Sequence, residues 1–108
     1  QTLLAQLAQG EVKFSDVLVF IEARYTHTPT AFKNGQQANA ATENQGSAKV
    51  FSFAQLNSLN KQQTLSLFAE HYTSVLNTPE ASDHQNIRQF MINGWDGIQF
   101  DGTALTAK

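Results

Sequence analysis

The sequence predicts a mainly α-helical fold, with an α+β arrangement as the alternative: a compact bundle of about five short helices with a small C-terminal β hairpin. Apolar residues recur at helical spacing in several segments, most clearly at Leu65, Phe68, Tyr72 and Val75. Capping and turn residues separate these segments. Hydrophobic residues make up 41% of the 108 residues and eight residues are phenylalanine, so the chain can bury one ring-rich core.

Two helices are expected before residue 25. The first, over residues 2–9, has its leucines on one face and ends at Gly10. The second begins with Ser15 as its N-cap and has Asp16 in its first turn. Its apolar run, residues 17–21, would also suit a buried strand. We favour a helix because the residues up to Arg24 extend it.

Residues 25–46 are expected to form a long loop. Thr28-Pro29-Thr30 and Asn34-Gly35 are turn signals, and the segment is rich in glutamine, asparagine and alanine. Loops of this length are uncommon in compact domains and are often functional. We therefore expect this loop to lie over the start of the last helix, where most of the other unusual polar residues occur.

Two helices are expected in the middle of the chain. Ser47 is a good N-cap for a helix over residues 47–56. Asn60 begins the next helix, because Gln63 three residues later completes a capping box. This helix carries the period of apolar residues described above and ends before Pro79.

The last helix is expected over residues 82–95. Ser82 and Gln85 form a second capping box, and the apolar stripe consists of Ile87, Phe90, Met91 and Trp95. Beyond it, apolar and polar residues alternate, and Asp101-Gly102 is a turn signal. Residues 98–106 therefore predict a short β hairpin.

Composition and charge exclude several classes of protein. Seven basic and nine acidic residues give a net charge of −2 without charged blocks, so we expect neither nucleic acid nor a membrane as partner. The absence of cysteine excludes disulfides and thiolate chemistry. No apolar run approaches the roughly 20 residues of a membrane-spanning helix. We expect a single domain over residues 1–108 and a monomer.

The start of the last helix holds the first candidate site. Asp83, His84, Asn86 and Arg88 lie within two turns, and His84 and Arg88 are neighbours on the helix surface. We favour a structural interpretation, in which these side chains hold the preceding loop. The alternative is a ligand site in which Arg88 and the helix N–H groups bind a phosphate or carboxylate.

The start of the middle helix offers a second anion-binding candidate. Ser47 follows a glycine at this start, and Lys49 falls in the first turn. The spacing of a phosphate-binding loop is absent, so we favour a plain helix cap here as well. The unknown partner would be a protein or a small-molecule anion.

An acid–base enzyme is the other class considered. Its pocket would lie between the 25–46 loop and the start of the last helix, with Glu43 working beside His27 or His84 and with Arg88. Histidines and carboxylates also serve as metal ligands, but their spacing here matches no recognised pattern. We therefore expect no metal and no cofactor.

Three stretches together resemble one protein family. They are Thr28-Pro29-Thr30-Ala31-Phe32-Lys33-Asn34-Gly35, Asn44-Gln45-Gly46-Ser47-Ala48-Lys49-Val50-Phe51-Ser52-Phe53-Ala54, and Asp83-His84-Gln85-Asn86-Ile87-Arg88 with Gly94-Trp95-Asp96-Gly97-Ile98 beyond it. Their order and spacing are similar to those of the HopJ family, over residues 3–107.

The HopJ resemblance implies a protein classed with type III secretion effectors of plant-pathogenic bacteria. It implies no defined biochemical activity and no catalytic residues that could be assigned here. We expect a binding or regulatory module. Secreted effectors usually begin with a flexible serine-rich leader, whereas an apolar helix is expected from residue 2. A resident cytoplasmic protein is therefore the first expectation, and secretion into a host cell is the alternative.

Overall fold

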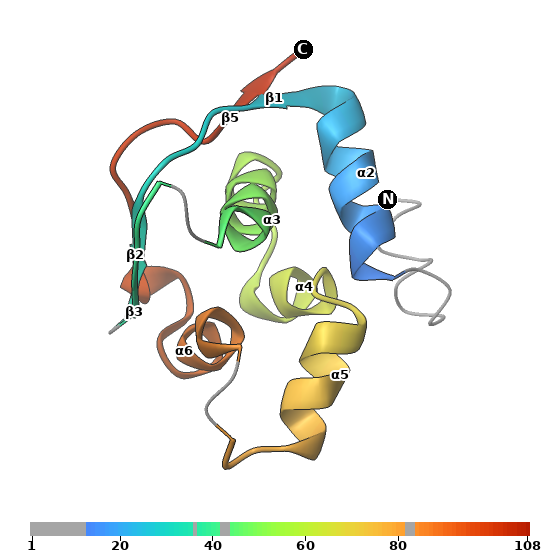
Figure 1. The fold of residues 1–108 in the computed structure, drawn as a ribbon, viewed down its shortest axis with the longest axis vertical. Coiled ribbons are helices and arrows are strands. Elements are labelled where there is room, and N and C mark those ends of the chain that lie inside the picture. The colour runs from blue at the N-terminus through green and yellow to red at the C-terminus, as the bar shows by residue number, and fades with distance from the viewer. Residues whose placement is uncertain (1–12, 36, 42–43, 82–83) are drawn as a thin grey trace.

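A central helix, α3 (Gln45–Leu56), organises the fold, and the other elements surround it in the view of Figure 1. Its buried residues lie on most of its circumference: Ala48, Val50, Phe51, Ser52, Phe53 and Ala54. A helix that is buried on most of its surface must pack against other elements on each of those sides. The computed structural model describes residues 13–35, 37–41, 44–81 and 84–108, so the helix expected over residues 2–9 lies outside the described part.

The mainly helical fold with C-terminal strands is confirmed. The other helices are α2 (Phe14–Arg24), α4 (Lys61–Ser66), α5 (Glu70–Asn77), α6 (Gln85–Asn93) and the 3₁₀ helix η1 (Gly94–Gly97). The apolar run 17–21 belongs to α2, so the helical interpretation of this run is correct. This helix begins one residue before Ser15, and the Asp16 carboxylate accepts the N–H of Lys13 at 3.1 Å.

The single helix expected from Asn60 to the residues before Pro79 is wrong, because the structure divides it into α4 and α5. The break lies at Ala69, whose φ is +51°. Leu65 and Leu67 are both buried, although a straight helix would turn them about 200° apart. Both leucines precede the break, and this segment contacts both α3 and α6, so more than one of its sides faces the core. The expected capping box at the start of α4 is confirmed, since Asn60 Oδ1 accepts the N–H of Gln63 at 2.8 Å.

The starts of α3 and α6 also differ from expectation. Helix α3 begins two residues before Ser47, after Asn44 in the left-handed region. Helix α6 begins at Gln85, after His84 in the same region, and Ser82 lies outside the described residues. Neither helix therefore uses the serine N-cap that was predicted from the sequence.

The long loop expected over residues 25–46 contains three strands. They are β1 (Tyr25–His27), β2 (Phe32–Asn34) and β3 (Gln37–Asn39). The expected turn at Asn34-Gly35 connects β2 to β3, with Gly35 at φ +59°. The N–H of Gly35 donates to the Gly97 carbonyl at 2.8 Å, which brings this turn against η1.

The two C-terminal strands, β4 (Ile98–Phe100) and β5 (Leu105–Ala107), occur within two residues of their expected positions. They do not pair with each other as the expected hairpin would. Strand β4 pairs antiparallel with β2, whereas β5 pairs antiparallel with β1. The sheets have the orders β3-β2-β4 and β1-β5. This pairing joins the C-terminal residues to the 25–39 segment along one side of α3 (Figure 1).

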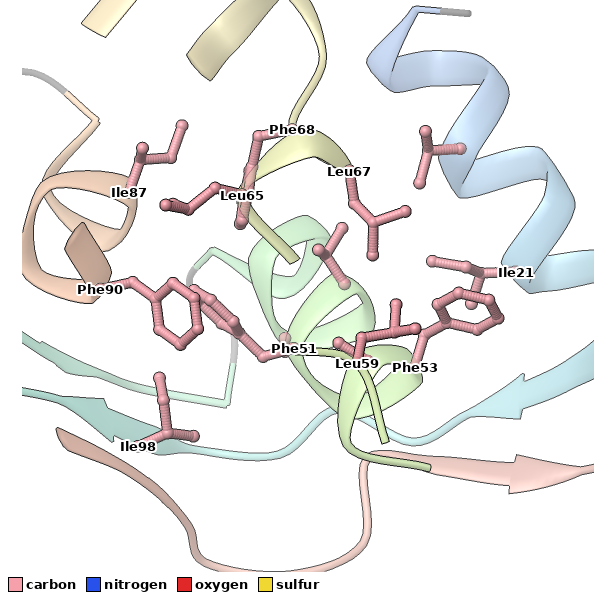
Figure 2. Close-up of a cluster of buried hydrophobic side chains, with 14 of the residues drawn as sticks. Ile21, Phe51, Phe53, Leu59, Leu65, Leu67, Phe68, Ile87, Phe90 and Ile98 are labelled. Carbon is pink, nitrogen blue, oxygen red and sulfur yellow. The ribbon is translucent and has the colours of Figure 1, made fainter. Parts of the chain in front are cut away.

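The core is a cluster of rings and branched aliphatic side chains around α3 (Figure 2). Phe51 is fully buried, and its ring centroid lies 5.0 Å from that of Phe90 and 5.4 Å from that of Phe68. Trp95 packs on Phe90 and donates its indole N–H to the Leu59 carbonyl at 3.1 Å. Trp95 is thus a structural anchor, as expected.

Candidate functional site

A pocket of about 320 Å³ opens where the starts of α3 and α6 meet α5 and the beginning of α2. Its lining includes Gly46 and Ser47 from α3, and Asn86 from α6. His71 of α5 and His84 also line it. Its volume falls at the lower end of the range for small-molecule sites, about 300–1,000 Å³.

Two helix N-termini border this pocket. The first-turn N–H groups of an α-helix have no acceptor within the helix, and they carry the positive end of its dipole. In both α3 and α6 the preceding residue, Asn44 or His84, is left-handed, with φ of +52° and +51°. A left-handed residue followed by a helical one directs successive N–H groups into a concavity that suits anions.

A row of rings forms another wall of the pocket. The Phe14 and Phe68 rings are stacked at 5.8 Å, with 8° between their planes. The edge of the His71 ring meets Phe14 at 4.8 Å, and the His71 and His84 rings lie 5.1 Å apart. Helices α2 and α5 and the residue before α6 thus contribute rings to one surface.

A network of four asparagine side chains joins the pocket to the strands behind it. Asn39 Nδ2 donates to Asn86 Oδ1, and Asn86 Nδ2 donates back to Asn39 Oδ1, each at 3.1 Å. Asn44 Nδ2 also donates to Asn39 Oδ1, at 2.6 Å. Asn34 Nδ2 donates to the backbone carbonyl of Asn86 at 2.6 Å. Asn39 therefore connects the starts of both helices that border the pocket.

The expected arrangement of the 25–46 segment over the last helix is confirmed for β2 and β3, whose Asn34 and Asn39 bond to Asn86. Asn34 and Asn39 are also buried, at 0% and 3% exposure. Asn34 Oδ1 has no hydrogen-bond partner among the described residues. These strands therefore support the floor of the pocket.

The sequence-predicted site residues divide into two groups. Ser47, His84 and Asn86 line the pocket together, although the sequence assigned Ser47 and His84 to separate candidate sites. Glu43 and Asp83 lie outside the described residues.

The remaining candidates contact other parts of the molecule. Arg88 donates to the Thr78 carbonyl at 2.8 Å and to its hydroxyl at 3.2 Å, so it ties the end of α5 to α6. Lys49 donates to Glu22 Oε2 at 2.8 Å and lowers the pKa of that carboxyl. His27 Nε2 lies 3.1 Å from Gln45 Oε1 and is not part of the pocket lining.

Sequence reasoning missed His71 and Phe14 as site residues. In the sequence, His71 follows Glu70 in an expected helix and belongs to no ligand motif. No sequence signal marks His71, because the break that places it in the first turn of α5 lies at Ala69, without a glycine or proline. No local pattern marks Phe14, which reaches the pocket only through tertiary packing.

Glu70 links the starts of α2 and α5 beside the pocket. Its Oε1 accepts the N–H of Phe14 at 2.6 Å. Burial alone would raise the pKa of the Glu70 carboxyl, but this bond and one from its own N–H lower the pKa overall. A carboxyl with a lowered folded-state pKa stabilises the fold above its unfolded pKa, and this contribution is lost as the pH falls through the folded pKa.

We therefore expect Glu70→Gln to be less stable than the wild type at neutral pH, with a difference that shrinks as the pH falls from about 6 to about 3. Glutamine keeps an acceptor for the N–H of Phe14 but loses the charge. Urea unfolding of both proteins across this pH range measures the difference. A constant difference over the whole range would contradict the assignment to the ionised carboxyl.

Among the described residues, no group of three histidine, cysteine or acidic side chains is placed to hold a metal ion. Within the same part of the chain, no helix combines the length and apolar character needed to cross a bilayer.

Comparisons with known proteins agree with the resemblance seen in the motifs. The profile of the HopJ type III effector protein family matches residues 1–105. The crystal structure of the unknown function protein VPA0580 is similar, with a TM-score of 0.93 and 49% sequence identity; the match covers 100% of this chain and 92% of that one. No curated protein matches the chain. The chain belongs to the HopJ type III effector protein family.

Proposed function

We propose that this protein is a binding module of regulatory type, which acts by holding a small anionic ligand in the pocket between α3, α5 and α6. One observation carries the proposal: two helix N-termini and two imidazole rings border the same pocket. Helix N–H groups and histidine side chains are donors that suit phosphate and carboxylate oxygens. No acidic side chain is among the described residues that line the pocket; the Glu70 carboxylate lies beside it and accepts the N–H of Phe14.

The test is a titration of ¹⁵N-labelled protein with inorganic phosphate and with acetate, followed by amide chemical shifts. We expect the N–H signals of Gly46, Ser47 and Asn86 to move with a common saturation curve. His84→Asn should weaken binding about tenfold, because the imidazole donor is replaced by a shorter amide that reaches less far towards the anion. Asparagine tolerates the left-handed conformation of residue 84, so the backbone should remain in place.

His27→Asn is the matched control for this experiment. It makes the same chemical change at a histidine outside the pocket lining, so anion binding should not change. The proposal fails when neither anion moves the three N–H signals. It also fails when both variants weaken binding equally, since the effect would then not belong to the pocket.

A small acid–base enzyme is the second candidate, favoured by the 5.1 Å separation of the His71 and His84 rings beside one pocket. A positioned imidazole commonly transfers protons at neutral pH. The ligand itself distinguishes the two candidates: a binding module leaves it unchanged over hours of incubation, whereas an enzyme converts it. One-dimensional NMR spectra of the ligand follow this directly.

The site of action is also part of the proposal. We propose that the protein works in the bacterial cytoplasm. The family description makes secretion into a host cell through a type III system the alternative.

A further inference from the structure

The aromatic rings of the pocket lie next to the helix starts that are proposed to bind the anion. A Cβ placed on Gly46, at the start of α3, would lie 3.5 Å from Phe14 Cε2. The Phe14 ring therefore reaches the helix start directly. A ligand whose anionic group contacts the N–H groups of α3 would have the rest of its atoms beside Phe14 and His71.

The ring surface is suited to a flat apolar group. Phe14 and His71 line the pocket, and both are only partly buried. Phe68 also lines the pocket and stacks on Phe14, with 5.8 Å between the ring centroids. Aromatic side chains prefer stacked or edge-to-face contacts with other rings, which are worth more than apolar burial alone.

We infer that the ligand of this pocket is a small aromatic acid: one planar ring that carries a carboxylate or phosphate. The carboxylate or phosphate would contact the helix starts, and the ring would pack on Phe14 and His71. A pocket of about 320 Å³ has room for a ligand of this size. The inference rests on the proposed anion site and adds the chemical class of its ligand.

Benzoate and cyclohexanecarboxylate are the probes that test the ring. Both carry one carboxylate on a six-membered ring, but only benzoate is planar and aromatic. Titration of ¹⁵N-labelled protein should show benzoate binding about threefold to tenfold more tightly. Its ring current should also shift the ring protons of His71. Inorganic phosphate, titrated in parallel, reports on the anion site alone.

Phe14→Leu separates the ring contact from apolar burial. It keeps an apolar side chain of similar size, so benzoate should lose its advantage over cyclohexanecarboxylate while phosphate binding is retained. Phe20→Leu is the control, because Phe20 lies on the same helix but packs on Phe53, outside the pocket lining. Should Phe14→Leu fold poorly, Phe14→Met makes the same test, because methionine is also apolar and non-aromatic but adapts more easily to its surroundings.

The outcomes are distinct. Equal affinities for benzoate and cyclohexanecarboxylate would overturn the ligand class and leave the anion site standing. Benzoate shifts that map away from Gly46, Ser47 and Asn86 would overturn it as well. An absence of binding by phosphate, acetate and benzoate alike would instead remove the proposed function on which the inference rests.

Discussion

Phe51→Ala should destabilise the protein by about 3–5 kcal/mol, the usual cost of removing a buried phenylalanine. Phe51 is 0% exposed and lies near the centre of the ring cluster. Its ring contacts those of Phe32, Phe68, Phe90 and Trp95. These neighbours come from β2, the end of α4, α6 and η1, so they cannot all move inward to fill the space. A loss of this size is a large part of the total stability of a small domain, about 5–15 kcal/mol.

Urea unfolding monitored by circular dichroism and by the single tryptophan, Trp95, measures this loss. Leu56→Ala is the control, because Leu56 lies on the same helix but is 56% exposed. Its effect should stay within about 0.5 kcal/mol. A loss below about 1.5 kcal/mol for Phe51→Ala would show that this ring is not the centre of the core.

Patterns that act over a few residues predicted the helical part of the fold well. The Asn60 and Gln63 capping box, the helix over 17–24 and the stripe of α6 depend on neighbours within one or two turns. Such contacts are fully specified by the local sequence. The break at Ala69 is different. No glycine or proline marks it, and the residue with a φ of +51° is an alanine, a type that rarely adopts this conformation.

Strands β1, β2 and β3 could not be predicted for a related reason. Each has three residues, and the inward positions of β2 and β3 include the polar residues Asn34 and Asn39. In a single sequence, asparagines at these positions indicate an exposed loop, not the buried side of a strand. They are tolerated here because each is hydrogen-bonded to a residue about 50 positions away, in α6.

The candidate site was predicted only where it depends on residues that are close together in the sequence. His84 and Asn86 were found because helix starts concentrate polar residues and free N–H groups. Ser47 was noted at a second helix start, but only the fold brings that start into the same pocket. Phe14 and His71 reach the pocket through packing of α2 against α5, which no local pattern encodes.

Asn39→Asp should cost about 3–5 kcal/mol at neutral pH, because it buries a charge whose contacts are asparagine amides and backbone carbonyls instead of a cation. Asn39 Nδ2 donates to the carbonyls of Phe32 and Gln37, each at 3.3 Å, and to Asn86 Oδ1. A carboxylate oxygen at this position would face three acceptors. Asn60→Asp is the matched control, since Asn60 uses its oxygen to cap α4, and aspartate caps equally well.

The pH dependence gives this substitution a signature that plain loss of packing would lack. Burial and the facing oxygens would raise the pKa of the carboxyl in Asn39→Asp above its unfolded value, about 3.9. For a carboxyl with a raised folded-state pKa, the penalty is absent below the unfolded pKa and grows as the pH rises towards the folded pKa. Urea unfolding from pH 7 to pH 4 should therefore show the variant recovering stability relative to the wild type.

Asn39 also bonds to Asn44 and Asn86 at the two helix starts, so phosphate binding measured at the same pH values should recover in parallel. Recovery of stability without recovery of binding would mean that the asparagine network supports the fold but does not position the pocket.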